Sequence, residues 1–319
     1  MKPLVKAVLL HQLQQSGCAT RVVSIEHLQD LQDRLTTQYR NGWFDQEFYQ
    51  ERLAFFTFSP PSSMLDARSI FIIAKRQPQV RFTFHWKGKS QPVMVPPTYL
   101  HWCETDRQVQ GCLTEVLGPF GYRVVPTVLP KKILAACSGL AVYGRNNITY
   151  AVGLGSFHRL TAFYSDWLCL DEDWQEPAFM ERCHTCRACL LHCPTGAIDP
   201  DRFLLRADRC ISFHNEKSGQ VPFPTWLETK WHNCLVGCMY CQTVCPENAQ
   251  SVEWIEQGAD FSSEETAQIV EGVPQDRWLA PMVEKLKTWD LWDMADLLPR
   301  NLGVLLQDQT AQRCPGPNL

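Results

Sequence analysis

Cys183-His-Thr-Cys186-Arg-Ala-Cys189-Leu-Leu-His-Cys193-Pro194 is the stretch that decides the fold of this 319-residue chain. Its spacing, C-x2-C-x2-C-x3-C-P, is the one by which bacterial proteins hold [4Fe–4S] clusters. Three thiolates two residues apart on a tight loop can bind three iron corners of one cube. The fourth cysteine, just before the proline, binds an iron of a different cluster. The stretch therefore predicts two clusters that exchange a ligand.

A second run completes the ligand set. Cys238-Met-Tyr-Cys241-Gln-Thr-Val-Cys245-Pro246 repeats the pattern with one cysteine missing at its front, and Cys210 can supply that thiolate. The exchange then assigns Cys183, Cys186, Cys189 and Cys245 to one cluster, and Cys193, Cys210, Cys238 and Cys241 to the other. Eight thiolates for two cubes is a complete set, which predicts an electron-transfer module with two [4Fe–4S] clusters.

Other ways of using these cysteines stay open. Cys234, four residues before Cys238, could replace Cys210 as a ligand. Histidine ligation by His184 or His192 is a minor option. Structural zinc also uses C-x2-C pairs. Zinc explains neither the third evenly spaced cysteine of the first run nor the C-x3-C-P that ends both runs, so the clusters are the preferred interpretation.

The composition of the whole chain is that of an ordinary globular protein. Hydrophobic residues make up 45% and charged residues 20%, and the net charge is −4. Nine of the fifteen cysteines fall between positions 183 and 245, which indicates metal binding and a reducing compartment such as the cytoplasm. The first residues do not match an export signal, and no apolar run reaches the length of a membrane span. We therefore expect a cytoplasmic protein without a membrane partner.

The pattern along the chain predicts three parts. Residues 1–175 are expected to form an α/β domain, residues 176–250 a double-cluster module like that of bacterial ferredoxins, and residues 251–319 an acidic helical segment. Within the first part, periodicity predicts strands at 21–25, 69–74 and 122–125, a hairpin at 80–95, and helices at 26–40, 105–117 and 131–137.

Several segments resemble the epoxyqueuosine reductase family. Gly139-Leu-Ala-Val-Tyr-Gly144-Arg-Asn-Asn147 is similar to the family's A-G-L-G-x-x-G-K-N segment, and Gly155-Ser-Phe157 to a G-S-F-like turn that follows it. Arg209-Cys-Ile-Ser-Phe213 looks like the family's R-C-I-S-Y, and Gly237-Cys-Met-Tyr-Cys-Gln-Thr-Val-Cys-Pro-Glu-Asn248 like its G-C-D-x-C-Q-x-V-C-P-x-N. The resemblance covers about residues 65–250.

This resemblance implies a nitroreductase-like α/β domain that holds base-off cobalamin where its relatives hold flavin, an arrangement that reductive dehalogenases share. The clusters would then deliver electrons to the cobalt. Glycines suit such a site because the backbone must approach a large planar ligand closely. Carried over by position, the cofactor-binding residues would be Gly139, Tyr143, Gly144, Arg145, Asn146, Gly155 and Ser156.

The sequence also departs from the family. The family's proposed proton donor is an Asp fourteen residues before the position of Gly139, where this chain has Val125, and a Glu six residues later is Lys131 here. Valine cannot donate a proton. Replacement acids would be Tyr99, His101, Lys131 or Tyr143, and no catalytic residue is assigned. From Glu247 onward, thirteen acidic against five basic residues would repel tRNA phosphates, so nucleic acid is not expected as a partner.

The preferred prediction is an iron–sulfur, cobalamin-dependent reductase of a small molecule or of another corrinoid centre. Its electrons would come from a low-potential donor such as ferredoxin or flavodoxin. One alternative is an electron-transfer or corrinoid-reactivating protein without substrate chemistry of its own. Another is a module that stores or escorts cobalamin. Reduction of epoxyqueuosine in tRNA is the least favoured possibility on these grounds.

Overall fold

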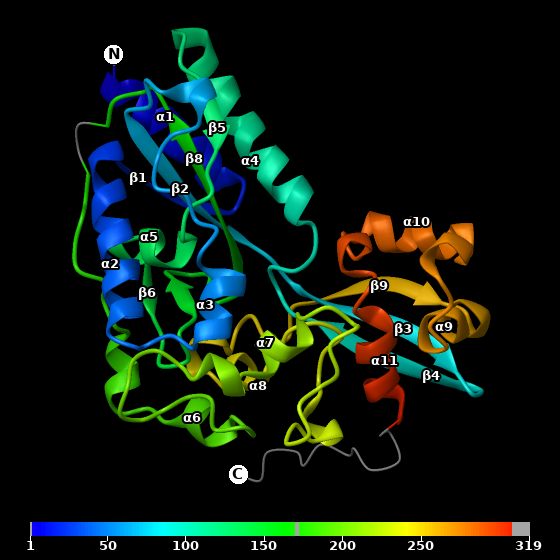
Figure 1. The fold of residues 1–319 in the computed structure, drawn as a ribbon. Coiled ribbons are helices and arrows are strands. Elements are labelled where there is room, and N and C mark those ends of the chain that lie inside the picture. Colours follow the sequence, from blue (N-terminus) through cyan, green and yellow to red (C-terminus); the bar gives the residue numbers. More distant parts are fainter. Residues whose placement is uncertain (1, 170–171, 308–319) are drawn as a thin grey trace.

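A computed structural model describes residues 2–169 and 172–307 (Figure 1). The helices are α1 (Lys2–Gln15), α2 (Leu28–Arg40), α3 (Gln46–Arg52), α4 (Trp102–Leu117), α5 (Lys131–Cys137), α6 (Ala188–His192), α7 (Ile211–Asn215), α8 (Tyr240–Thr243), α9 (Ser263–Val270), α10 (Ala280–Thr288) and α11 (Leu298–Gln307). The strands are β1 (Cys18–Ser24), β2 (Ser69–Arg76), β3 (Gln79–Trp86), β4 (Lys89–Val95), β5 (Val124–Pro126), β6 (Ala141–Tyr143), β7 (Thr149–Ala151), β8 (His158–Ser165) and β9 (Ile255–Phe261).

The N-terminal half builds an α/β lobe around a four-stranded sheet of order β1-β2-β8-β5, in which neighbouring strands are antiparallel. Side chains alternate between the two faces of a strand. On β2, Ile70 and Ile72 therefore pack under α2 and α5, while Phe71 and Ile73 pack under α1 and α4. Both faces of the sheet are covered, and the predicted α/β fold class is confirmed.

A second lobe joins residues that lie far apart in the sequence. β3 and β4 form an antiparallel hairpin, and β9 adds to β3 in parallel, with Gln79 opposite Ile255. Helices α9, α10 and α11 cover this sheet, as Figure 1 shows at the right. Phe82, Phe84 and Phe261 are fully buried between strands and helices.

This packing corrects two details of the predicted division. The hairpin predicted at 80–95 was expected within the domain of residues 1–175, but β3 and β4 share their core with β9 and helices α9, α10 and α11. The reason is its apolar face, since Val80, Phe82 and Phe84 are covered by the C-terminal helices. Between residues 251 and 307 the segment predicted to be helical contains α9, α10 and α11 but also strand β9, and residues 308–319 lie outside the described residues.

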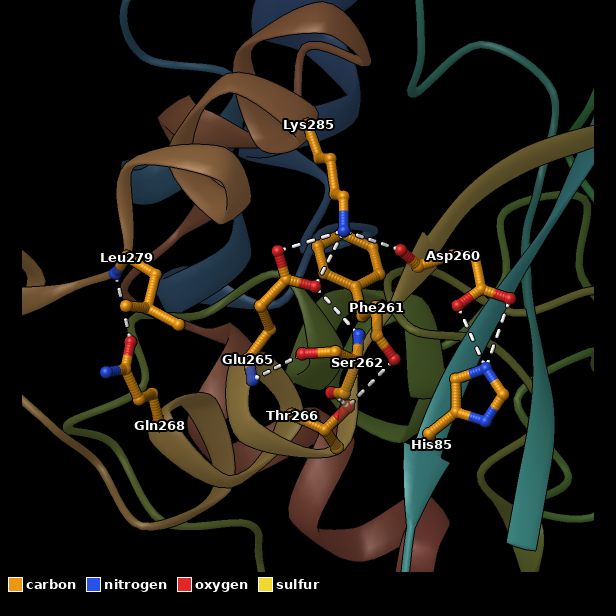
Figure 2. A network of polar contacts seen from close by, with 9 residues as sticks. All are labelled: His85, Asp260, Phe261, Ser262, Glu265, Thr266, Gln268, Leu279 and Lys285. Carbon is orange, nitrogen blue, oxygen red and sulfur yellow. Dashed lines mark hydrogen bonds and ion pairs between the residues drawn. The ribbon is translucent and has the colours of Figure 1, made fainter.

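The C-terminal lobe is fixed by a polar network around Glu265 (Figure 2). Ser262 and Glu265 form a capping box at the start of α9. The buried carboxylate of Glu265 also accepts from Lys285 Nζ of α10 at 2.6 Å, and the same Nζ donates to the Asp260 carbonyl at 2.7 Å. Across the strand pair, His85 of β3 contacts the Asp260 carboxylate of β9 at 2.9 Å. The network ties β9 to both helices.

Between the two lobes lies a module of short helices and turns that carries the clustered cysteines. Arg300 of α11 holds one of its loops: the guanidinium donates to five carbonyl oxygens, those of His214, Asn215, Lys217, Ser218 and Val221. In the part of the chain that the structure describes, no helix has the length and apolar character that crossing a membrane requires.

Candidate metal centre

The cysteines of the first predicted cluster lie together. Cys183, Cys186, Cys189 and Cys245 line one pocket, which they share with Arg145, Tyr150 and Met180. Burial, with smaller contributions from the charges of Cys183 and Cys245, raises the pKa of the Cys189 thiol to about 11. Such a thiol keeps its proton near neutral pH unless a metal replaces it. We call these four residues the first group.

The cysteines of the second predicted cluster also lie within electrostatic reach of one another. Burial raises the pKa of Cys241 well above its ordinary value, and the charges of Cys238 and Cys210 raise it further. Burial likewise raises the pKa of Cys210, and the charge of Cys193 adds to this effect. We call these four residues the second group. The charge of Cys189 also acts on Cys241, so the two groups are neighbours.

The two groups fit a pair of clusters. Each brings together thiols from both cysteine runs, since Cys245 stands with the first group and Cys193 with the second, which is the exchange expected from the spacing. Among the described residues, no three His, Cys, Asp or Glu side chains converge on the position of a single metal ion.

Cys234 has different surroundings. It is buried in an apolar cluster with Phe157 and Met239. Burial raises the pKa of its thiol, and the backbone N–H of Met239 opposes this effect. Its charge also raises the pKa of Cys238, so it stands close to the second group. The apolar packing supports Cys210 over Cys234 as the eighth ligand.

The turn between β6 and β7 joins the α/β lobe to both groups of cysteines. The backbone N–H of Arg145 donates to Cys183 Sγ at 3.5 Å, and its Nη2 donates to the Cys183 carbonyl at 2.6 Å. Asn146 Nδ2 lies 3.4 Å from the Cys241 carbonyl oxygen and 3.0 Å from the Tyr150 hydroxyl. One residue of the turn thus contacts the first group and the next residue contacts the second.

A second contact between the α/β lobe and the module joins Ser156, which follows β7, to Asn248, the last residue of the second cysteine motif. Asn248 is fully buried, and its Oδ1 accepts from the Ser156 backbone N–H at 2.9 Å. Its Nδ2 donates to Ser156 Oγ at 2.8 Å and to the Gln242 carbonyl at 2.9 Å. Ser156 Oγ in turn donates to Gln242 Oε1 at 2.8 Å. This closed network seats the module on the α/β lobe.

Other protein atoms lie close to the glycines of the predicted cofactor site. A Cβ on Gly144 would lie 2.5 Å from the Tyr150 ring, and one on Gly155 would lie 2.5 Å from Asn248 Oδ1. At Gly139 the φ of +68° is the reason for glycine, since a Cβ there would lie 3.4 Å from Gln175 Nε2, an ordinary contact. These features explain the glycines without a planar ligand.

Tyr143, the remaining member of the predicted cofactor set, is buried and packs its ring edge-on against Phe203. Six of the seven residues, all except Gly139, therefore lie at the contact between the α/β lobe and the cluster module. The assignment of the set to a cofactor rests on the resemblance alone.

Polar residues surround the second group; sequence reasoning selected Tyr99 among them, as a candidate replacement acid, but not Lys132 or Glu216. Tyr99 donates its hydroxyl hydrogen to Glu216 Oε1, and its ring lies against Gly237, next to Cys238. The side chain of Lys132 reaches solvent, yet enclosure by the surrounding protein lowers its pKa, while the charges of Glu216 and Cys210 oppose this shift. No local motif marks Lys132 or Glu216, because only the tertiary fold brings them to the cysteines.

The structure separates the four residues considered as replacement acids. Tyr99 lies at the second group, as described above. His101 is the residue just before α4, and its ring tilts against Trp289. Burial lowers the pKa of Lys131, and the charge of Arg159 adds to this effect while that of Asp106 opposes it. Tyr143 is enclosed at the contact between the α/β lobe and the cluster module. Val125 itself lies in β5, paired with Tyr164, and packs on the core of the α/β lobe.

Comparison with known proteins agrees with this architecture. A family model described as a 4Fe-4S double cluster binding domain matches residues 182–248, a range that contains all eight predicted ligands. The predicted pair of [4Fe–4S] clusters is thereby confirmed at the level of the domain.

Curated relatives are named epoxyqueuosine reductase. The protein of Francisella cf. novicida is 32% identical over 145 residues, which are 44% of this chain and 39% of the relative. The protein of Pseudomonas aeruginosa is 37% identical over 137 residues, 41% of this chain and 36% of the relative. The matched region thus spans about two fifths of the length of these relatives.

Solved epoxyqueuosine reductases share the fold. The structure from Streptococcus thermophilus superposes with a TM-score of 0.66 at 17% identity, covering 96% of this chain and 82% of that one. An epoxyqueuosine reductase solved with an epoxyqueuosine-modified tRNA stem loop gives a TM-score of 0.65 at 21% identity, covering 95% and 81%.

These relatives contradict two predictions, that the substrate is a small molecule or a corrinoid centre and that nucleic acid is not a partner. The second prediction rested on the acidity of the chain after residue 246. That acidity is confined to one part of the chain, since residues 1–246 carry 25 basic against 21 acidic residues.

The predicted resemblance itself is confirmed by the domain match, by the sequence relatives and by the shared fold. The chain is a relative of the epoxyqueuosine reductases that carries a 4Fe–4S double cluster binding domain.

Proposed function

We propose that this chain is an iron–sulfur oxidoreductase that reduces an epoxide-bearing modified nucleoside in tRNA. The observation that carries the proposal is the pairing of the two cysteine groups with the fold of the epoxyqueuosine reductases, one of which is solved with a tRNA stem loop. Reduction of an epoxide consumes two electrons and two protons. Two [4Fe–4S] clusters, each a one-electron carrier, supply the electrons when bound.

The surroundings of the two groups suggest a direction for the electrons. The first group lines a surface pocket. The second group stands beside Tyr99, Lys132 and Glu216, polar side chains that a substrate would meet. We therefore propose that electrons enter at the first group and leave at the second, on the side of Tyr99 and Lys132.

Lys132 is the proton source that we propose for this site, because the position of the family's acid holds Val125. Enclosure lowers the pKa of Lys132, which makes its ammonium group a stronger acid than an ordinary lysine. The same positive charge suits a tRNA phosphate or an oxygen that gains negative charge. Tyr99 and Glu216, joined by a hydrogen bond, would hold the polar wall beside it.

Among the described residues of the α/β lobe, no contact supports a corrinoid. Two of the glycines assigned to it, Gly144 and Gly155, are required by their contacts with Tyr150 and Asn248, so they give no separate support for a large planar group. No step of the proposed function therefore passes through cobalamin. A cytoplasmic location is part of the proposal, because cysteine ligands of such clusters persist where thiols stay reduced.

The test uses anaerobically purified protein with about eight irons per chain. It is incubated with a chemical reductant and a tRNA stem loop that carries epoxyqueuosine, and the nucleosides are then analysed by mass spectrometry. We expect conversion of the epoxide, loss of conversion in Cys210→Ala, and at least a tenfold slower reaction in Lys132→Met with its iron content retained. An absence of conversion by fully loaded protein would overturn the proposed function.

A further inference from the structure

Arg145 has an unusual position for a residue first considered as part of a cofactor site. It follows Gly144 in the tight turn between β6 and β7, where the Gly144 N–H donates to the Ile148 carbonyl at 2.8 Å. Asn147 of the same turn adopts a left-handed backbone with φ of 57°, and its amide contacts the Phe203 carbonyl at 2.9 Å. The turn is therefore held at both ends, and the place of Arg145 against the cysteines is set by the backbone.

Three nitrogen atoms of Arg145 lie at the first group. The backbone N–H donates to Cys183 Sγ at 3.5 Å, and Nη2 donates to the Cys183 carbonyl at 2.6 Å. Nε is buried and has no hydrogen-bond partner among the described residues. The residue lines the same pocket as the four thiols. A buried N–H donor without an acceptor destabilises the folded protein. The sulfur atoms of a bound cluster can accept such a hydrogen bond.

The guanidinium is also the uncompensated cation of this pocket. Arg182 and Glu247 line it as well, but they form an ion pair at 2.6 Å, so their charges largely cancel. Because the Arg145 guanidinium donates to the Cys183 carbonyl, its positive charge stands beside this ligand and stabilises negative charge there. No carboxylate among the described residues pairs with Arg145, whose other neighbour is the Phe179 ring at 5.8 Å.

A cluster becomes one unit more negative when it accepts an electron. Hydrogen bonds to its sulfur atoms and nearby positive charge stabilise that reduced form, and both raise the reduction potential. The second group has a different electrostatic environment. The positive charge of Lys132 acts on Cys210 and Cys241, but the negative charge of Glu216 partly cancels it.

We propose that Arg145 raises the reduction potential of the cluster held by Cys183, Cys186, Cys189 and Cys245, and so makes it the first of the two clusters to be reduced. The inference depends on the cluster content and not on the substrate proposed above. Arg145 belongs to the α/β lobe, yet it would affect electron transfer by contacting the cluster ligand Cys183. It would not act through a cofactor bound in its own lobe.

The test is a redox titration of anaerobic protein, followed by electron paramagnetic resonance, on wild type and on Arg145→Gln, Arg145→Lys and Arg182→Gln. In Arg145→Gln we expect the equilibrium constant for reduction of one cluster to fall about tenfold, which is 59 mV for a one-electron couple. The other cluster should keep its potential. The affected signal should be the one that a Cys186→Ala variant lacks.

Arg145→Lys keeps the charge but loses the donor fork, so we expect a smaller shift of the same sign. Arg182→Gln, which removes a paired cation from the same pocket, serves as the matched control and should shift that potential less than Arg145→Gln does. Equal potentials in wild type and Arg145→Gln, or an equal shift of both clusters, would overturn the proposal. If Arg145→Gln fails to load iron, an unchanged potential in Arg145→Lys overturns it instead. None of these measurements needs tRNA, so they stand apart from the test of the proposed function.

Discussion

Gly155 provides a direct test of how the cluster module is seated. Its φ is +59°, and an added Cβ would lie 2.5 Å from Asn248 Oδ1 and 2.9 Å from the Glu247 carbonyl oxygen. In Gly155→Ala the left-handed backbone costs about 1 kcal/mol. The methyl group would also displace the buried Asn248 amide from Ser156 and Gln242, which costs about 1 kcal/mol for each of two hydrogen bonds. We expect a loss of about 3 kcal/mol, or about a hundredfold in the equilibrium constant for unfolding.

Gly153 supplies the matched control for this change. It has φ of +75°, and nothing lies within 4 Å of an added Cβ, so Gly153→Ala should cost only the backbone term of about 1 kcal/mol. The assay is urea denaturation under anaerobic conditions, with tryptophan fluorescence for the fold and visible absorbance for the clusters. Gly155→Ala should unfold at clearly lower urea and release iron earlier. Equal effects of the two substitutions would refute the packing argument.

Three further predictions concern other parts of the chain. Cys210→Ala should lower the iron content to about four per chain, whereas Cys234→Ala should leave about eight; the reverse result in an iron assay would exchange their roles. Burial lowers the pKa of His158 to about 4, below its unfolded value of about 6.5, so its contribution to stability is present above pH 6.5 and is lost as the pH falls towards 4. Urea denaturation at pH 7 and pH 5 should therefore show a pH-dependent loss that is smaller in His158→Gln, and an unchanged loss would contradict this reasoning. Glu265→Gln, which breaks the buried pair with Lys285, should destabilise the protein by about 2 kcal/mol without changing the iron content, and an unaltered urea midpoint would show that the pair adds nothing.

The cluster ligands could be predicted from the sequence because their signal is local. Two residues between cysteines restrict three thiols to one loop, and the structure gathers Cys183, Cys186 and Cys189 in one pocket as that spacing requires. The helix predicted at 131–137 and the strand at 69–74 also appear, since both carry clear apolar patterns. Local chemistry and tertiary structure agree at these places.

Other features could not be predicted because they depend on distant partners. Strand β9 reads Ile-Glu-Gln-Gly-Ala-Asp-Phe, a polar segment that becomes a strand only by pairing with β3. Lys132 and Glu216 are ordinary charged residues in the sequence, and only the fold brings their charges near Cys210. Gly144 and Gly155 were interpreted as contacts to a ligand, since the sequence does not show that Tyr150 and Asn248 occupy that space.

The parallel pairing of β3 with β9 has a consequence for the order in which the protein is made. The paired residues Gln79 and Ile255 are about 175 positions apart, so this lobe cannot close until the ribosome has released β9. All eight predicted cluster ligands precede β9 in the chain. Iron can therefore be inserted while the apolar face of Val80, Phe82 and Phe84 is still uncovered and before Arg300 grips the loop at 214–221. Closure of the C-terminal lobe would then seal a module whose metal is already in place.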